Sequence, residues 1–182
     1  MAKPLLTWSY GALHRLNSVL VVGSVVLCAL LQPHRLPGMT LLDVAPNWLL
    51  IWVVTWSVRR PPIQGAIAGI ALGWIQDAMT APHPTHAIGL GVVGFLTSSL
   101  DKQRFIEEDF ISAALLVFLM AILAEGILAT QIALRGEWVL PQIWIHLQQV
   151  ALSSALISSL WTPLVYVPLN RWWDRLNFLT DR

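Results

Sequence analysis

Six stretches of mostly apolar residues run along the chain, separated by short polar segments. They cover residues 16–31, 41–58, 63–79, 87–100, 110–134 and 143–169. A helix needs about 20 apolar residues to cross the ~30 Å hydrocarbon core of a bilayer, and fewer suffice inside a bundle or in a thinner membrane. The pattern therefore predicts an all-α membrane protein in which residues 1–182 form one domain, a compact bundle of six transmembrane helices.

The second stretch is the weakest of the six. Asp43, Pro46 and Asn47 interrupt it and leave residues 48–58 as its apolar part. At 1.5 Å per residue, this part reaches across about half of the hydrocarbon core. Proline is favoured at the first position of a helix, so we expect Pro46 to open this one. Whether residues 41–58 cross the membrane completely stays open at this point.

The positions of the basic residues predict how the helices are oriented. Lys and Arg in short loops are retained on the cytoplasmic side of a membrane. If the N-terminus is cytoplasmic, only Arg35 and Arg135 of the eleven Lys and Arg residues fall on the outer side. The others are Lys3, Arg15, Arg59, Arg60, Lys102, Arg104, Arg171, Arg175 and Arg182. We therefore expect a multi-pass membrane protein with both termini in the cytoplasm.

The composition supports a membrane protein and argues against several other classes. Of the 182 residues, 56% are hydrophobic and only 12% are charged, against about 25% charged residues in an ordinary soluble domain. The net charge of +1 argues against a nucleic-acid partner, because phosphate binding needs a concentrated basic surface. Cys28 is the only cysteine, which excludes a disulfide framework and a cysteine-based metal site.

The third stretch carries small residues at a helical spacing. Gly65, Gly69, Gly73 and Asp77 recur every four residues and therefore share one face of a helix. Glycines in this arrangement let a second helix approach closely in a membrane. Matching small residues are Gly91, Gly94 and Ser98 in the fourth stretch and Ser154, Ser158 and Thr162 in the sixth. We expect these three faces to pack against one another, although small residues can also be tolerated without such a role.

Two carboxylates, Asp77 and Glu125, fall inside predicted spans. At 1.5 Å per residue, both lie about 22 Å from the cytoplasmic ends of their helices, in the outer half of the membrane. An ionisable group there costs at least about 2.5 kcal/mol, so we expect both to face protein, water or a partner instead of lipid. Further polar residues at the outer side are His83, His86, Gln131, His146, Gln148 and Gln149. We expect an outward-facing polar cluster among the third, fifth and sixth spans.

Three kinds of site could use such a cluster. A general acid and base pair would need a nucleophile or an activated water, and the chain has no nucleophile or metalloprotease motif. A metal site would need a third ligand beside His83 and His86, which we expect in a loop near the lipid headgroups. We therefore predict no catalytic, cofactor or metal site. Asp77 would then cap backbone amides at the end of the third span or bind a cation of a partner.

Tryptophans mark further surfaces. Trp48, Trp52 and Trp56 repeat every four residues and form one stripe, which could face lipid, fill the bundle or receive a partner helix. Residues 170–182 place aromatic and apolar side chains on one side and charges elsewhere, which predicts a cytoplasmic interfacial tail. The expected anchors at the membrane interfaces are Trp138, Trp144, Trp172 and Trp173.

The segment around Asp77 resembles a known family. Residues 46–54 read PNWLLIWVV and residues 65–96 read GAIAGIALGWIQDAMTAPHPTHAIGLGVVGFL. Together with six stretches in a chain of this length, they resemble MreD, an integral membrane protein family that determines rod shape in bacteria. The resemblance is carried by the spacing of Gly69, Gly73, Asp77, Gly89 and Gly94 around a short outer loop.

The resemblance implies a non-enzymatic subunit of the cell-elongation (rod) complex in the bacterial inner membrane. Such a subunit binds the bitopic protein MreC and works with RodA, a class B penicillin-binding protein and, indirectly, MreB in lateral peptidoglycan synthesis and cell-shape maintenance. The family fold is similar to the substrate-binding subunits of ECF-type vitamin transporters. The alternative is therefore a small-solute binding subunit, in which Asp77 and Glu125 hold the ligand.

A set of residues follows from these considerations as the candidate for helix packing or partner binding. They are Gly65, Gly69, Gly73, Asp77, Gly91, Gly94 and Glu125. The expected partners are the lipid bilayer and the proteins of the rod complex. Whether the bundle also forms a homodimer stays open.

Overall fold

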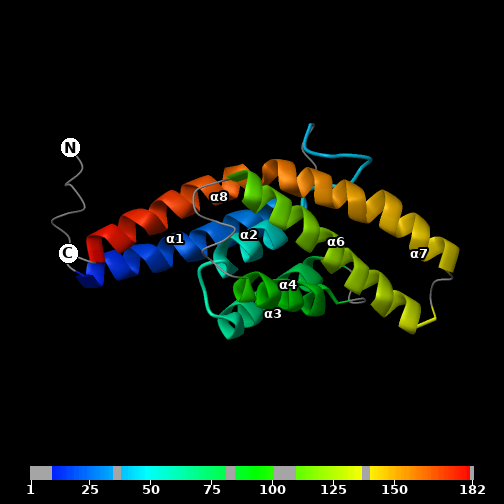
Figure 1. Ribbon diagram of the computed structural model, residues 1–182, viewed down its shortest axis with the longest axis horizontal. Coiled ribbons are helices and arrows are strands. Elements are labelled where there is room, and N and C mark those ends of the chain that lie inside the picture. The colour runs from blue at the N-terminus through cyan, green and yellow to red at the C-terminus, as the bar shows by residue number, and fades with distance from the viewer. Residues whose placement is uncertain (1–9, 35–37, 81–84, 101–109, 137–139, 181–182) are drawn as a thin grey trace.

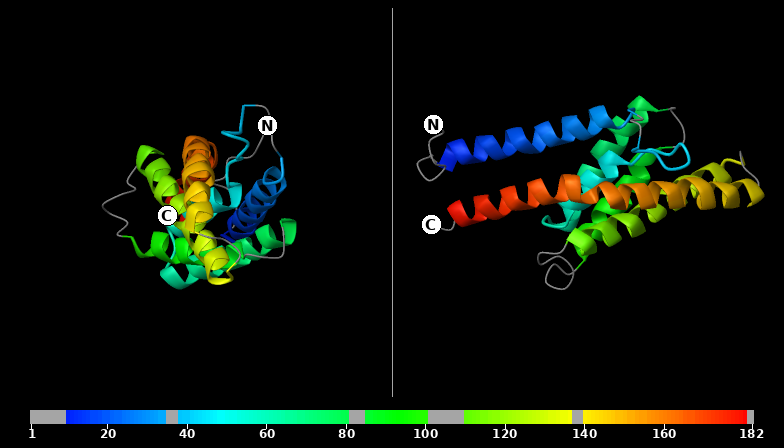
Figure 2. Two further views of the ribbon diagram at one scale, coloured as in Figure 1. Left: turned by 90° about the vertical axis from the view of Figure 1, so that its right-hand side faces the viewer. Right: turned by 90° about the horizontal axis from the view of Figure 1, so that it is seen from above.

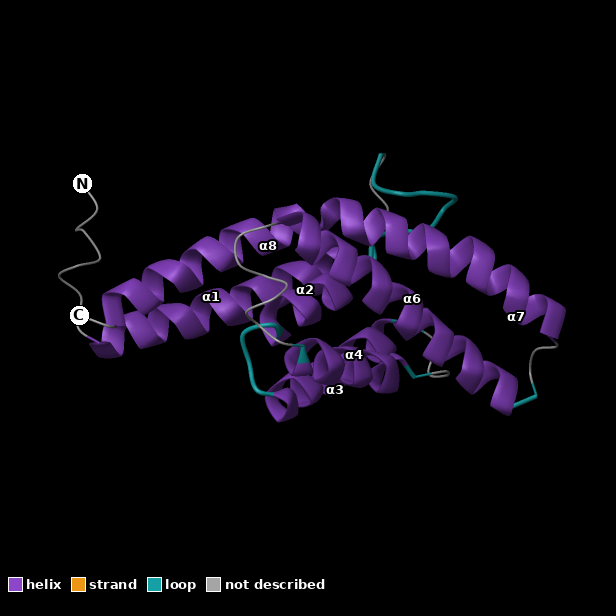
Figure 3. Cartoon of the chain, viewed as in Figure 1, coloured by secondary structure: helices purple, strands orange, loops and turns teal. Residues whose placement is uncertain are grey.

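The computed structural model describes residues 10–34, 38–80, 85–100, 110–136 and 140–180, and these residues form helices without a β-strand (Figure 3). The helices are α1 (Tyr10–Leu31), α2 (Trp48–Ser57), α3 (Pro62–Met79), α4 (His86–Ser99), α6 (Phe110–Leu134), α7 (Leu140–His146) and α8 (Leu152–Thr180). A π-helical turn, η2 (Leu147–Ala151), joins α7 to α8. Each predicted stretch corresponds to a helical segment, so the all-helical fold is confirmed. The predictions for Lys3, Arg35, His83, Lys102, Arg104, Trp138 and Arg182 concern residues outside the described ranges.

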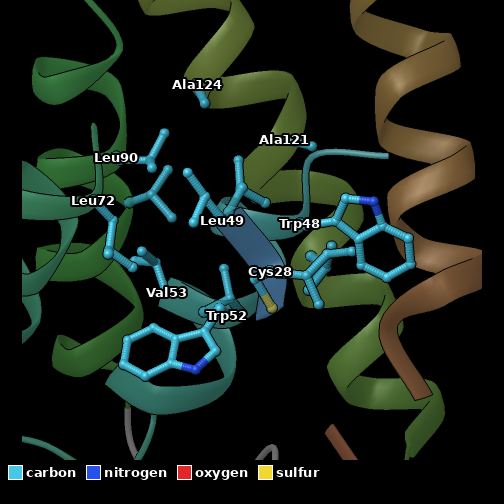
Figure 4. Packing of buried hydrophobic residues seen from close by; sticks show 14 of the residues in the cluster. Cys28, Trp48, Leu49, Trp52, Val53, Leu72, Leu90, Ala121 and Ala124 are labelled. Carbon is cyan, nitrogen blue, oxygen red and sulfur yellow. The ribbon is translucent and has the colours of Figure 1, made fainter. Parts of the chain in front are cut away.

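α2 lies at the centre of the bundle (Figure 1). All of its residues except Trp56 are buried, and it contacts α1, α3, α4, α6 and α8. Figure 4 shows Trp48, Leu49, Trp52 and Val53 of α2 among side chains of the surrounding helices. A helix that is apolar on every side is typical of such a buried position. Trp48 and Trp52 thus fill the interior of the bundle. They neither face lipid nor receive a partner helix, the two alternatives that the tryptophan spacing left open.

The residues before α2 form a tight turn instead of a helix. The backbones of Leu41 and Val44 exchange two hydrogen bonds of 3.0 and 2.9 Å, and Leu42 and Asp43 between them have positive φ angles of 51° and 63°. This left-handed backbone conformation cannot continue a right-handed helix. The prediction of a span over residues 41–58 is therefore wrong for its first part.

Asn47 marks the start of α2. Its side-chain oxygen accepts a hydrogen bond of 3.0 Å from the backbone N–H of Leu50, which satisfies one of the free amides of the first turn. Its own backbone N–H donates to Ser158 Oγ on α8 at 2.9 Å. Pro46 precedes this cap and does not open the helix as expected. α2 has ten residues, a length of about 15 Å, and so covers about half of the hydrocarbon core of a bilayer.

Two helical segments are long and apolar enough to cross a membrane, judged by length and composition. They are Phe110–Leu134 and Pro141–Leu176. Shorter apolar helical segments cover Arg15–Leu31, Trp48–Ser57 and His86–Ser99. Many large apolar side chains point outward from the bundle, for example Leu119 of α6 and Leu160 of α8, which are 53% and 71% exposed. Such an outer surface suits lipid better than water.

The last helix is longer than predicted. Its helical conformation begins at Leu140 and continues through η2 to Thr180. The sequence predicts instead a span over residues 143–169 followed by a separate tail over residues 170–182. Up to Thr180, that tail is the end of α8, and only its location at a membrane interface stays a prediction.

The end of α8 runs beside α1 (Figure 1) and is joined by an ion pair to the connection between α2 and α3. Trp172 Nε1 donates a hydrogen bond of 3.4 Å to Asn17 Oδ1 on α1. Arg59 forms an ion pair of 2.7 Å with Asp174. Trp173 belongs to the buried core, so it is not the interface anchor that we predicted. These contacts explain why the end of the chain continues as a helix that is held against the bundle.

Candidate functional site at the α3–α4 hairpin

α3 and α4 form the most extensive contact among the described helices, and glycines bring their backbones together. A Cβ atom on Gly65 would lie 2.4 Å from Gly94 O, one on Gly69 2.0 Å from Leu90 O, and one on Gly73 2.3 Å from Ala87 Cα. Such distances are far shorter than a van der Waals contact, so a side chain at any of these positions would push the helices apart. Close packing of this kind drives helix association in lipid, where no hydrophobic effect operates between helices.

The two α4 glycines of the predicted face differ in their surroundings. A Cβ atom on Gly94 would lie 2.1 Å from Gly65 O, whereas one on Gly91 would meet the side chain of Ile70 at 2.7 Å. A backbone atom cannot move aside as a side chain can, so Gly94 is the more constrained position. The predicted small-residue faces of α3 and α4 thus pack together. The predicted face of α8 does not join them, because its Ser158 Oγ accepts a hydrogen bond from the backbone N–H of Asn47 at the start of α2.

Asp77 lies in the last turn of α3, where its carboxylate caps the start of α4. Its Oδ1 accepts a hydrogen bond of 2.6 Å from the backbone N–H of His86, and its Oδ2 accepts one of 3.3 Å from that of Ala87. Thr85 Oγ1 also accepts from Ala87 N–H, at 3.1 Å. The first amides of a helix lack partners within the helix, and a negative charge there is favoured by the helix dipole. Of the two roles considered for Asp77, capping is the one that these contacts show.

His86 has a different place from the one predicted. We expected a loop histidine near the headgroups, but His86 is the first residue of α4. Its ring Nδ1 is hydrogen-bonded to Asp77 Oδ1 at 2.8 Å, and the side chains of His86 and Asp77 are only 20% and 15% exposed. The carboxylate therefore binds both the backbone and the ring of the same residue, which fixes the connection between the two helices.

α6 completes the polar site. Gln131 Nε2 donates a hydrogen bond of 3.1 Å to the backbone oxygen of Thr85. Glu125 lines a small pocket together with Thr85, His86 and Asn47, so it lies beside the hairpin connection, near Asp77. This pocket has a volume of about 10 Å³, roughly the space that one water molecule needs.

The polar cluster therefore combines α3, α4 and α6, which correspond to the third, fourth and fifth predicted spans. The prediction that the sixth span takes part instead of the fourth is wrong. Gln148 and Gln149 of η2 are exposed, and the side chain of His146 lies outside the described part. The amides at the start of α4 supply the donors that attract the carboxylate, and no sequence spacing within the third span could indicate them.

The site offers little for metal chemistry. Among the residues that the structure describes, no group of three or more His, Cys, Asp and Glu side chains could hold a metal ion. Both oxygens of Asp77 accept hydrogen bonds from α4. The hydrogen bonds of Asp77 hold α3 and α4 in one relative position.

The segment that carries this site matches a known family. The family model described as rod shape-determining protein MreD matches residues 14–168. The chain belongs to the MreD family. The matched range contains both helices of the hairpin and Asp77, which lies next to their connection. No curated protein and no solved structure matches the chain, so the expected likeness to the substrate-binding subunits of ECF-type transporters has no support from a known structure.

Membership of the MreD family also agrees with the helices of the chain. MreD proteins are membrane proteins, and the two long apolar segments in α6 and in α7 to α8 are suited to crossing a membrane. The resemblance rested on the spacing of Gly69, Gly73, Asp77, Gly89 and Gly94, and at the level of the family it is confirmed. In this MreD chain, Gly69, Gly73 and Asp77 lie at the contact between α3 and α4.

Proposed function

We propose that this chain is a non-enzymatic membrane subunit of the bacterial cell-elongation complex. In this role it binds the bitopic protein MreC. It thereby supports lateral peptidoglycan synthesis by RodA and a class B penicillin-binding protein, with MreB acting indirectly from the cytoplasm. The observation that carries the proposal is the match to the MreD family over residues 14–168.

The packing of the bundle supports a scaffold. The interior is filled by the side chains of α2, and the α3–α4 contact leaves no space for a side chain between the backbones. The outer face of α3 is apolar and open, since Ile63, Ile67 and Trp74 are 73%, 61% and 66% exposed. A rigid body with such a surface can present a fixed apolar face to a partner helix within the membrane.

A solute-binding subunit is less well supported. Asp77 and Glu125 are the residues expected to hold a ligand, but the pocket beside Glu125 has a volume of only about 10 Å³. Pockets for small-molecule ligands usually have volumes of about 300 to 1,000 Å³. Asp77 is already hydrogen-bonded to two backbone amides. The geometry therefore favours a protein that acts through its outer surface.

Complementation tests the proposed function. The chain is expressed, together with MreC from the same genome, in a rod-shaped bacterium that is depleted of its own MreD. We expect rod shape to be restored, as measured by the length-to-width ratio of the cells. A matched control is Gly69→Leu, which should not restore it because the side chain separates α3 from α4. Round cells that contain the wild-type chain, folded and inserted in the membrane, would contradict the proposal.

We also propose that both termini lie in the cytoplasm, and the distribution of the basic residues supports this orientation. A fluorescent protein fused after Arg182 should therefore be shielded from a protease added outside spheroplasts. Digestion of the fused protein in intact spheroplasts would overturn the orientation.

A further inference from the structure

A long apolar groove lies between α1 and α8. The two helices run side by side at the end of the molecule where α1 begins and α8 ends (Figures 1 and 2). The groove has a volume of about 600 Å³ and is lined almost entirely by apolar side chains. Its walls include Val19, Gly23 and Leu27 of α1 and Leu164 and Pro168 of α8. It is by far larger than the pocket at the α3–α4 hairpin.

Gly23 keeps the groove open on the α1 side. No atom lies within 4 Å of the position that its Cβ would occupy. This glycine therefore does not serve close helix packing as the α3 glycines do, and the space beside it belongs to the groove. A larger side chain at this position would extend into the groove, and its Cβ would meet no other part of the protein.

The groove is long enough to hold an extended acyl chain. Val19 and Leu31, two of its lining residues, lie about 18 Å apart along α1 at 1.5 Å per residue. The groove therefore offers an apolar path of about this length between α1 and α8. An extended hydrocarbon chain can lie along it.

Three arginines border one end of the groove. On α8, Arg171 and Arg175 follow Pro168 at spacings of three and seven residues and so share its face of the helix. On α1, Arg15 lies one turn before Val19. All three side chains are exposed. Among the described residues, none of these arginines forms an ion pair.

Trp172 lies at the same end of the groove as the arginines, between Arg171 and Arg175 along α8. Its side chain lines the groove, and its Nε1 donates a hydrogen bond to Asn17 Oδ1 across to α1. Indole rings favour the boundary between hydrocarbon and headgroups. The apolar groove thus ends at an indole ring and at arginines, which matches the acyl chain, the interface and the phosphate of a membrane lipid.

We propose that this groove binds an anionic phospholipid. An acyl chain lies in the groove beside Gly23, and the headgroup phosphate is bound by Arg15, Arg171 and Arg175. Guanidinium groups donate paired hydrogen bonds to phosphate, and basic pockets between transmembrane helices on the cytoplasmic side bind anionic headgroups. The site is distinct from the α3–α4 hairpin, and it does not depend on which protein partner the chain binds.

Native mass spectrometry of the purified full chain tests this site. The protein is mixed with equal amounts of palmitoyl-oleoyl phosphatidylglycerol and phosphatidylcholine, and the bound forms are counted. We expect phosphatidylglycerol to be preferred, and replacement of Arg15, Arg171 and Arg175 by Gln to lower its affinity by about fivefold for each arginine. The variant Gly23→Leu should weaken the binding of both lipids, because it fills the part that holds the acyl chain.

Matched controls keep the outcome clear. Arg135→Gln removes a charge at the end of α6, and Gly126→Leu adds a side chain where no atom lies within 4 Å of the Cβ position, so both should bind lipid like the wild type. Equal binding of the two lipids by the wild type would overturn the role of the arginines. Unchanged binding by Gly23→Leu would overturn the groove as the site, and so would a protein helix that co-purifies with the wild type and is lost in Gly23→Leu.

Discussion

The α3–α4 pair and the α1–α8 pair are both made of apolar helices that run side by side, yet they are packed in opposite ways. In α3–α4, the backbones touch through Gly65, Gly69 and Gly73. Between α1 and α8, a groove of about 600 Å³ remains, and Gly23 faces open space. The same residue type thus closes one interface and leaves the other open.

The difference shows what fixes the contact between two membrane helices. In lipid, apolar surface alone does not drive helices together, so association needs close packing and polar contacts. The α3–α4 pair has both, since Asp77 caps the start of α4. Between α1 and α8, the described residues show a long hydrogen bond of 3.4 Å from Trp172 to Asn17, and the groove lies between the two helices. We conclude that the first pair forms the rigid part of the protein and the second is the part suited to a ligand.

The largest difference in stability is expected when one glycine in each helix pair is replaced by leucine. Gly69→Leu should lower the free energy of unfolding by about 3 kcal/mol or more, because the new side chain overlaps the α4 backbone. Gly23→Leu should change it by no more than about 0.5 kcal/mol in lipid-free detergent, because nothing lies within 4 Å of the new Cβ atom and the side chain extends into the groove. Reversible unfolding in mixed micelles measures both values. An equal loss of unfolding free energy in the two variants would contradict the difference between the two helix pairs.

A smaller effect is expected at the cap of α4. Asp77→Ala leaves the amides of His86 and Ala87 without their acceptor and should cost about 2 kcal/mol. Asp77→Asn keeps one acceptor oxygen and should cost about 1 kcal/mol. The same unfolding assay, combined with the cell-shape assay, separates the variants. If Asp77→Ala matches the wild type in both assays, Asp77 does not hold the hairpin.

The smallest effect is expected where α8 meets the connection between α2 and α3. The side chains of Arg59 and Asp174 are 30% and 55% exposed, and exposed ion pairs contribute about 1 kcal/mol at most. Asp174→Asn should therefore lower the stability by about 0.5 kcal/mol, with a smaller loss at 0.5 M salt because ions screen the pair. A loss as large as that of Asp77→Ala would show that the end of α8 is as firmly held as the hairpin.

The sequence predicts the α3–α4 contact because a helix has a fixed period. Gly65, Gly69 and Gly73 recur every four residues, and this spacing places them on one face whatever the rest of the fold. The seven residues proposed for packing or partner binding fall around the hairpin, although their part in binding a partner stays a prediction.

Other features depend on contacts between distant residues and could not be predicted. Leu42 and Asp43 adopt a left-handed conformation that their residue types do not indicate. Nothing in the sequence separates His86, which meets Asp77, from the neighbouring His83. α8 also continues past Pro168, because neighbouring helices and local adjustments can satisfy the backbone groups that a proline frees in a membrane helix. The groove between α1 and α8 follows from how far apart two helices lie, which no spacing along the chain expresses.

We propose that this MreD chain acts by binding MreC in the membrane. The most direct measurement is the amount of MreC that co-purifies with the tagged full chain from its native membrane, determined by quantitative mass spectrometry. We predict that MreC is recovered with the wild type and with Gly23→Leu in similar amounts, and that recovery falls with Asp77→Ala. A folded, membrane-inserted wild-type chain that recovers no MreC, and instead retains a small molecule that stabilises it against heat, would contradict the account.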